Sequence, residues 1–262
     1  MALGDEASGG LSRNSLKIIA CVAMLIDHIG EGFIEPWGQW YYLSQFIGYC
    51  AAPIFFFFIV EGYHHTGNRN VYTLRLLSFA ALSYFPFIIY FYGPVSAGNA
   101  LQLNIMYTLL IGLLVIRVRH EIRRVWLKII LIALLFILST AGDWNFYAPL
   151  IILAFDVFRG DRKKQLAAYL LIALFFRQGQ IVGLLSGYFT TIFDNLLQPR
   201  YIDLDFSPVG NIWHYLGLFL PAALLHFYNE NKGAAAPGAK WGFYLFYPVH
   251  LAILAFIKYV LL

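Results

Sequence analysis

Long apolar runs recur from Leu16 to the end of the chain, and no polar block as large as a soluble domain separates them. Hydrophobic residues make up 60% of the sequence and charged residues only 12%, whereas about a quarter of a soluble domain is charged. The runs are continuous, unlike the alternating segments of outer-membrane barrels. The sequence therefore predicts an all-α, polytopic transmembrane helical bundle of about nine or ten membrane segments. The runs fall at residues 16–35, 41–60, 72–92, 101–117, 125–141, 145–158, 165–193, 210–228 and 241–261.

Three of these runs depart from the length that one crossing requires. The runs 125–141 and 145–158 are short compared with the roughly 20 residues that cross a bilayer core, and they form a hairpin around the sequence AGDW. The run 165–193 is long, and its second half is rich in small and polar residues. Three alternatives stay open for this run: one span, two spans, or a broken or re-entrant second half whose irregular backbone is covered by protein.

Basic residues set the expected orientation. With nine crossings and a cytoplasmic N-terminus, 15 of the 18 Lys and Arg residues fall on the cytoplasmic side, as the positive-inside rule requires. A ten-crossing arrangement would move Lys232 and Lys240 outside, so it ranks second. Topology accounts for the net charge of +4, and no nucleic-acid partner is expected.

The chain is expected to form a single integral membrane domain over residues 1–262. Its polar N-terminus, 1–15, would be cytoplasmic, and a short polar linker would span 231–240. No cleavable signal peptide is expected, because no small-residue cleavage site follows the first apolar run. Cys21 and Cys50 both lie in apolar runs and are interpreted as packing residues.

Asp27 and His28 interrupt the first apolar run, and His250 interrupts the last. Ionisable groups inside a membrane segment are costly, and are functional candidates by default. At 1.5 Å per residue, His28 lies ~18 Å and His250 ~13 Å from the cytoplasmic start of their helices. Two imidazoles at comparable depth predict one shared polar cavity.

Asp27 is not the simple partner of its neighbour. Adjacent residues of a helix point about 100° apart, so Asp27 needs a partner on another helix, while Glu31 is the i+3 neighbour of His28. A break of the helix at Gly30 or Gly32 would relax this restriction.

A second polar cluster lies in residues 60–76, at the cytoplasmic end of the second run. Its members are Glu61, His64, His65, Arg69 and Arg75. Glu61 and His64 have a metal-binding spacing, but a diiron bundle needs two such pairs and more carboxylates, so no metal is predicted. Arg and His at a membrane surface suit a phosphate-bearing ligand; the alternative is a positive-inside loop. The basic stretches 116–124 and 159–164 are interpreted as topology signals or anionic-lipid contacts.

Several stretches resemble the TraX family in the same order along most of the chain. They are LKIIACVAMLIDHIG (16–30), PIFFFFIVEGYHHTGNRNVYTLRLL (53–77), NIMYTLLIGLL (104–114), DWNFYAPLIILAFDVFR (143–159) and FYLFYPVHLAIL (243–254). The resemblance implies a multi-pass protein of the bacterial cytoplasmic membrane that moves acetyl groups from cytosolic acetyl-CoA to an acceptor. TraX is associated with acetylation of pilin, so the resemblance implies a pilin-like peptide as acceptor; a glycan is the alternative.

The resemblance also implies roles for individual residues. Asp27 and His28 would be the chemical centre, Glu61, His64 and Arg69 a second motif, and Tyr247, Pro248 and His250 a third. The family's third span commonly reads Glu-x-Pro-Phe-Asp, whereas SYFPFII (83–89) lacks both carboxylates, which puts the acceptor in question.

An acetyltransferase mechanism assigns these residues as follows. His28 would be the general base, with His250 binding the oxyanion or relaying the proton. Asp27 would fix a tautomer or bind an ammonium acceptor. CoA carries three phosphate groups, and the residues expected at its cytoplasmic mouth are Arg13, Lys17, Glu61, His64, Arg69 and Arg75. The competing predictions are a transporter or proton-coupled carrier that uses the same buried groups, and a structural assembly factor.

Overall fold

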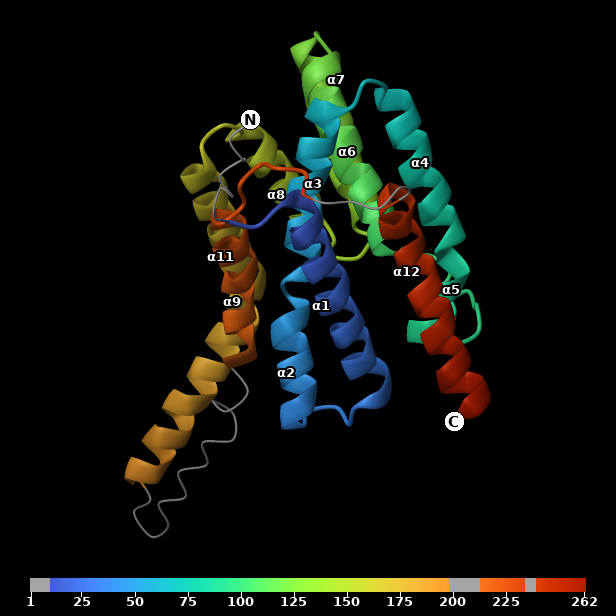
Figure 1. Cartoon of the computed structure of the whole chain (residues 1–262). Coiled ribbons are helices and arrows are strands. Elements are labelled where there is room, and N and C mark those ends of the chain that lie inside the picture. Colours follow the sequence, from blue (N-terminus) through green and yellow to red (C-terminus); the bar gives the residue numbers. More distant parts are fainter. Residues whose placement is uncertain (1–9, 198–212, 234–238) are drawn as a thin grey trace, which may run out of the picture.

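The computed structural model describes residues 10–197, 213–233 and 239–262, and its regular elements are helices (Figure 1). In chain order they are α1 (Arg13–Phe33), α2 (Gln39–Gly48), α3 (Ala51–His65), α4 (Arg69–Leu82), α5 (Tyr84–Tyr92), α6 (Ile105–Glu121), α7 (Val125–Ser139), α8 (Tyr147–Val157), α9 (Arg162–Leu197), η1 (Trp213–Phe219), α11 (Leu220–His226), α12 (Ala239–Phe256) and η2 (Ile257–Leu261). The all-α prediction is confirmed.

Side-chain caps fix the start of several helices. Ser12 Oγ accepts from the Ser15 N–H at the start of α1, and Asn68 Oδ1 accepts from Val71 at the start of α4. Asn104 caps α6 through the Tyr107 N–H. Each cap satisfies a main-chain donor that the first turn leaves without a helical partner.

Two of the predicted spans are each divided into two helices. The run 41–60 is interrupted at Tyr49 and Cys50 between α2 and α3, and the run 72–92 is interrupted at Ser83 between α4 and α5. A proline ring clashes with the carbonyl four residues earlier, which is that of Tyr49 for Pro53 and that of Leu82 for Pro86. Both breaks therefore fall where proline prevents an unbroken helix.

Of the alternatives that the sequence left open for 165–193, a broken second half is excluded, because α9 runs without interruption from Arg162 to Leu197. The helix α1 is also continuous through Gly30 and Gly32. Its glycines serve close packing instead: a Cβ on Gly30 would lie 1.7 Å from Ser44 Oγ, and one on Gly32 would lie 2.0 Å from Tyr90 Oη. Residues 1–9 of the predicted N-terminal segment, 210–212 of the eighth run and 234–238 of the predicted linker lie outside the described residues.

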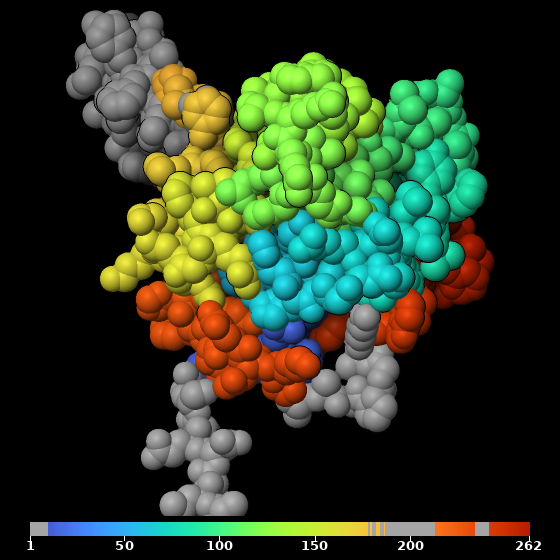
Figure 2. All heavy atoms as spheres, turned by 90° about the horizontal axis from the view of Figure 1, so that it is seen from above, coloured from blue at the N-terminus to red at the C-terminus, as the bar shows by residue number. Residues whose placement is uncertain are grey.

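Basic residues occupy the start of α1, α4 and α9 and the end of α6. We call this end of the bundle, at which α1 begins, the basic end (Figure 1). Ion pairs between helix termini define it: Arg69 with Glu121 at 3.8 Å, Arg159 with Glu61 at 3.2 Å and Arg162 with Glu230 at 3.4 Å. Seen from this end, the segment around residues 60–75 (cyan) lies between the green α6–α7 region and the orange segment that follows residue 212 (Figure 2).

Apolar side chains cover much of the outer surface. On α7 only Ser139 is buried, while Trp126, Ile129 and Ile137 are each at least 60% exposed. Among the described residues, three helical stretches are long and apolar enough to cross a membrane, namely Gln39–His65, Arg69–Tyr92 and Trp241–Leu261, and α7 and α8 are shorter apolar helices. An apolar exterior of this kind suits lipid contact.

Candidate functional site

The two histidines from opposite ends of the chain meet in the interior. His28 Nδ1 lies 2.8 Å from His250 Nε2, and the rings are nearly parallel, with 9° between their planes. Both residues are buried, with 9% and 6% of their surface exposed. The structure thus brings α1 and α12 together at the pair that the sequence singled out.

The partners of His250 decide which nitrogen of each ring carries hydrogen. His250 Nδ1 donates to the main-chain carbonyl of Phe246 at 2.7 Å, since a carbonyl can only accept. A neutral imidazole has one N–H, so His250 Nε2 is an acceptor and His28 Nδ1 is the donor of the 2.8 Å bond. His28 Nε2 is therefore left with a free lone pair, the form that a general base needs.

The ring of His28 is also held by aromatic neighbours. Phe91 meets it edge-on, with ring centres 5.2 Å apart, and Tyr247 lies at 6.4 Å. The Tyr90 hydroxyl donates to the main-chain carbonyl of His28. Lys258 in turn donates to the Tyr90 carbonyl at 3.2 Å. These contacts come from α5, α12 and η2, so several elements fix the position of one imidazole.

Because α1 is regular, the Asp27 side chain points about 100° away from that of His28, and it lies against Gly48, at the end of α2. A Cβ on Gly48 would stand 2.1 Å from Asp27 Oδ1, so only glycine accommodates this approach.

Asp27 lines a cavity of about 290 Å³ together with Glu31, Asp143 and Arg177. We call it the acidic cavity, since three carboxyl groups and one guanidinium line it. Its wall also includes His28 and Gln45, and Gln45 Nε2 donates to Glu31 Oε1 at 3.4 Å.

Asp143, in the loop between α7 and α8, has a perturbed carboxyl group. Part of the residue is exposed, but the protein around the carboxyl raises its pKa to about 6. Desolvation is the largest cause, and it outweighs the Trp144 main-chain N–H and the charge of Arg177, both of which lower the pKa.

A second cavity, of about 600 Å³, lies toward the basic end; we call it the basic cavity. Its cationic lining residues are Arg13, Lys17, Arg75 and Lys232. Lys17 Nζ lies 5.2 Å from the centre of the Phe58 ring, and the Arg75 guanidinium lies 5.2 Å from the Trp241 ring. Such contacts hold the cations against aromatic faces while leaving charge available to an anion.

The two cavities share part of their walls. Met24, Phe55, Ile105 and Tyr247 line both. These four residues form a partition between the cavities. It lies beside His28, which lines the acidic cavity and has its ring centre 6.4 Å from that of Tyr247, and beside Phe246, which lines the basic cavity. Two molecules that entered from the two cavities would meet at this partition.

Three residues expected at the cytoplasmic mouth lie outside the lining of the basic cavity. Arg69 stacks on Tyr63, with its guanidinium 4.5 Å from the ring centre, and pairs with Glu121. Glu61 pairs with Arg159, and His64 Nε2 bonds Asp156 Oδ1 at 2.7 Å. Arg13, Lys17 and Arg75 are thus brought together, whereas Glu61, His64 and Arg69 are not.

Asp143, Arg177 and Tyr90 are site residues that sequence reasoning missed. Asp143 falls in the AGDW hairpin, and Arg177 interrupts a long apolar run. A charged residue at such a place was a usable signal, since buried charge in a membrane segment is rare. Tyr90 carried no signal, because tyrosine is abundant in the chain.

Comparison with known proteins identifies the family of the chain. The model of the family described as TraX protein matches residues 12–258. A curated relative, "Probable fimbrial assembly protein FimC, serogroup H1" from Dichelobacter nodosus, is 34% identical over 249 residues, which cover 93% of this chain and 94% of the relative. No solved structure matches. Since both matches span nearly the whole chain, the protein belongs to the TraX family.

Proposed function

We propose that this protein is a multi-pass acetyltransferase of the bacterial cytoplasmic membrane, which moves an acetyl group from acetyl-CoA to an acceptor. The observation that carries the proposal is the His28–His250 pair beside the partition between a basic and an acidic cavity. In a nine-crossing arrangement with the N-terminus inside, the basic end faces the cytoplasm, as the distribution of Lys and Arg favours.

The donor would bind in the basic cavity. Cytosolic acetyl-CoA carries phosphate groups at one end and the thioester at the other, so its anionic end suits Arg13, Lys17 and Arg75. The apolar remainder of the cavity, which includes Met106 and Leu109, suits the neutral arm of the molecule. The thioester would then reach the partition near Met24 and Tyr247.

The acceptor would bind in the acidic cavity, where Asp27, Glu31 and Asp143 favour a cationic group such as an ammonium. The fimbrial assembly relative favours a pilin-like peptide, whose terminal amine fits this description; a glycan hydroxyl is the alternative. The carboxylates that the family's third span commonly carries are absent from Ser83–Ile88. We assign their role to Asp143, on the neighbouring loop of the same cavity.

His28 would act as the general base in this reaction. An ammonium acceptor first gives one proton to a carboxylate of the acidic cavity and becomes a neutral amine. His28 Nε2 then takes a proton from this amine as the new bond to the acetyl carbon forms and the carbon–sulfur bond breaks. The same proton then passes to the departing thiolate, which restores neutral His28. His250 would serve as a positioning residue, because its Nδ1 is bonded to Phe246 and its Nε2 to His28. This assignment replaces the oxyanion role considered from the sequence.

A transporter or proton-coupled carrier is the second candidate. The shared wall of the two cavities favours it, since transport sites also lie at a thin barrier between two compartments. Saturable thermal stabilisation of the purified protein by acetyl-CoA would favour the enzyme, because a small-solute carrier has no need of a basic phosphate site.

Incubation of membranes with labelled acetyl-CoA tests the proposed function. We expect the label to appear on a protein, glycan or lipid with the wild-type chain, and to be lost with His28→Ala. The matched control is His226→Ala, an exposed histidine of α11, which should keep full labelling. Equal expression and membrane insertion of the variants is checked by immunoblotting. Normal labelling with His28→Ala would remove His28 from catalysis, and no wild-type labelling of any acceptor would reject the enzyme.

A further inference from the structure

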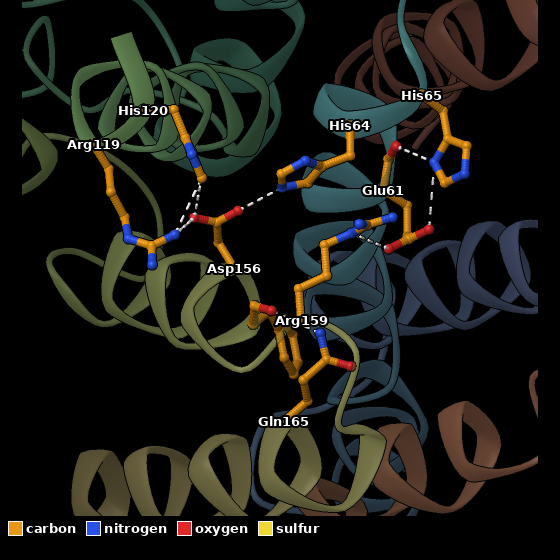
Figure 3. Close-up of polar contacts among 9 residues, drawn as sticks. Glu61, His64, His65, Arg119, His120, Asp156, Arg159 and Gln165 are labelled. Atoms are coloured by element: carbon orange, nitrogen blue, oxygen red, sulfur yellow. Dashed lines mark hydrogen bonds and ion pairs between the residues drawn. The ribbon is translucent and has the colours of Figure 1, made fainter. Parts of the chain in front are cut away.

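Three helices end at one polar cluster of the basic end, separate from the two cavities (Figure 3). His64 lies near the end of α3, His120 near the end of α6 and Asp156 near the end of α8. His64 Nε2 is 2.7 Å from Asp156 Oδ1, and His120 Nε2 is 2.9 Å from Asp156 Oδ2. One ligand atom from each residue lies within 4.8 Å of the others. We propose that this cluster binds a divalent transition metal ion such as Zn²⁺.

The donor atoms favour this class of ion over other cations. Two imidazole nitrogens and one carboxylate oxygen are a common set for zinc, with three protein ligands and one open position. Calcium and magnesium prefer oxygen ligands, so the two histidines disfavour them. The three ligands come from three different helices, so no short sequence motif marks the site.

The cluster is open to solvent on one side, which gives the ion a route to it. The Asp156 side chain is fully buried, with 0% of its surface exposed, while those of His64 and His120 are 22% and 36% exposed. An ion could therefore approach from the side of the imidazoles and meet a carboxylate fixed in the interior. The exposed side would hold the water or other ligand that completes the coordination.

The rings are oriented by their neighbours. Tyr63 stacks on His120 with ring centres 5.5 Å apart, and His64 meets His120 edge-on at 5.4 Å. Both imidazoles turn Nε2 toward Asp156, so each carries its proton there in the metal-free form. Metal binding would move that proton to Nδ1, and small side-chain rotations would bring the ligand atoms to about 2 Å from the ion.

Arg119 is the competitor of the metal. Its guanidinium contacts Asp156 Oδ2, and it lies 3.1 Å from His120 Nε2. A guanidinium and a metal ion both draw on the same carboxylate, and their charges repel each other. Removal of the Arg119 charge should therefore strengthen metal binding. If the cluster is held by hydrogen bonds alone and binds no metal, removal of Arg119 should instead lower the stability of the protein, since Asp156 would lose a partner.

Metal binding would join segments that are distant in the sequence. His64 and Asp156 are 92 residues apart, and His120 and Asp156 are 36 apart. The ion would fasten the end of α3, from which Gly62 and His65 reach the basic cavity, to α6 and α8. Its first effect would be greater stability of the folded protein, because an ion that binds only this state stabilises it.

The experiment measures Zn²⁺ on the purified full-length chain after treatment with a chelator. Calorimetry and elemental analysis should give one Zn²⁺ per chain, with a rise in the thermal midpoint. Affinity should fall about tenfold or more in His64→Gln and in His120→Gln, because loss of even an outer-shell partner costs that much. His226→Ala is the matched control and should bind as the wild type does. Arg119→Gln should bind Zn²⁺ more tightly than the wild type.

Several outcomes would overturn the proposal. One is the absence of stoichiometric Zn²⁺ from the wild type; another is unchanged affinity in both His64→Gln and His120→Gln. Weaker binding in Arg119→Gln would show that the guanidinium supports the site, which contradicts its proposed competition with the ion for Asp156. Circular dichroism and size-exclusion profiles identify any variant that fails to fold, and each single histidine variant retains one imidazole and Arg119 on Asp156.

Discussion

The carboxyl group of Asp27 lies directly against Gly48, so that a Cβ built on Gly48 would stand 2.1 Å from Oδ1 and 2.6 Å from the Asp27 Cβ. The contact joins α1 to the end of α2, where the chain turns toward α3. Both residues line the acidic cavity. A glycine at position 48 thus lets the two helices approach and leaves room for a carboxyl group beside His28.

Replacement of this glycine should damage both stability and activity. The methyl group of Gly48→Ala must displace Asp27 or separate the helices, and overpacking of this kind costs about 1–3 kcal/mol. We expect a lower thermal midpoint and a loss of acetyl transfer. The control is Gly179→Ala on α9, where an added Cβ meets nothing within 4 Å and better helix propensity should leave stability equal or higher. An unchanged midpoint in Gly48→Ala would contradict the contact.

The sequence allowed the helical bundle and the central histidines to be predicted, because both depend on patterns within single helices. Apolar runs require helices in a membrane, and distance along a helix places His28 and His250 at similar depth. The structure confirms the all-α fold and shows the two imidazoles at 2.8 Å.

Contacts between helices were harder to predict. His120 and Asp156 lie in stretches that read as positive-inside signals or apolar runs, and only folding brings them to His64. Glu61 and His64 share a metal-binding spacing, yet Glu61 turns to Arg159 and His64 to Asp156. Spacing fixes which residues share a helix face, but it does not tell which other helix packs there. The breaks at Tyr49 and Ser83 were readable from Pro53 and Pro86, since proline excludes a regular helix.

The two arginines of the 60–76 cluster should differ in their effect on the donor. Arg75 lines the basic cavity, whereas Arg69 is held by Tyr63 and Glu121 outside its lining. A hydrogen bond to a charged group contributes about 1.5–3 kcal/mol, so Arg75→Gln should raise KM for acetyl-CoA roughly ten- to hundredfold, with a small change in kcat. Arg69→Gln is the control and should leave KM close to that of the wild type. Steady-state kinetics at varied acetyl-CoA concentration measure both KM values. A raised KM in Arg69→Gln with an unchanged KM in Arg75→Gln would exclude Arg75 from the donor site.

His250 should influence the rate through His28 rather than through substrate binding. His250→Phe keeps a ring but removes the acceptor of the His28 Nδ1–H, so the tautomer with a free Nε2 loses its support. General-base catalysis typically contributes about 10²–10⁴-fold, and we expect kcat to fall by at least about a hundredfold with little change in KM for acetyl-CoA.

The conservative variant separates this positioning role from simple packing. The side-chain carbonyl of His250→Gln can accept a hydrogen bond, so this variant should recover part of the activity that His250→Phe loses. Equal activity of the two variants would argue against control of the tautomer. Their pH–rate profiles provide a second measurement, since loss of the His250 partner should shift the profile that His28 governs.

Asp143 should make the stability of the protein depend on pH. Its pKa in the folded chain is about 6, above the ordinary value of 3.8 for an aspartate carboxyl group, so the folded state holds the proton more tightly than the unfolded state. The stability of the folded protein therefore falls as pH rises between about 4 and 6. Outside that range, the contribution of Asp143 to stability does not change with pH. Asp143→Asn removes the titration while its side-chain oxygen can still accept from the Trp144 N–H. We expect the thermal midpoint of the wild type to fall more than that of Asp143→Asn over this interval, and parallel curves would show that the carboxyl titrates normally.

The same comparison in the presence of acceptor tests the charge of the acceptor. A cationic acceptor should stabilise the wild type increasingly above pH 6 through the ionised carboxylate, whereas a neutral hydroxyl acceptor should show no such step.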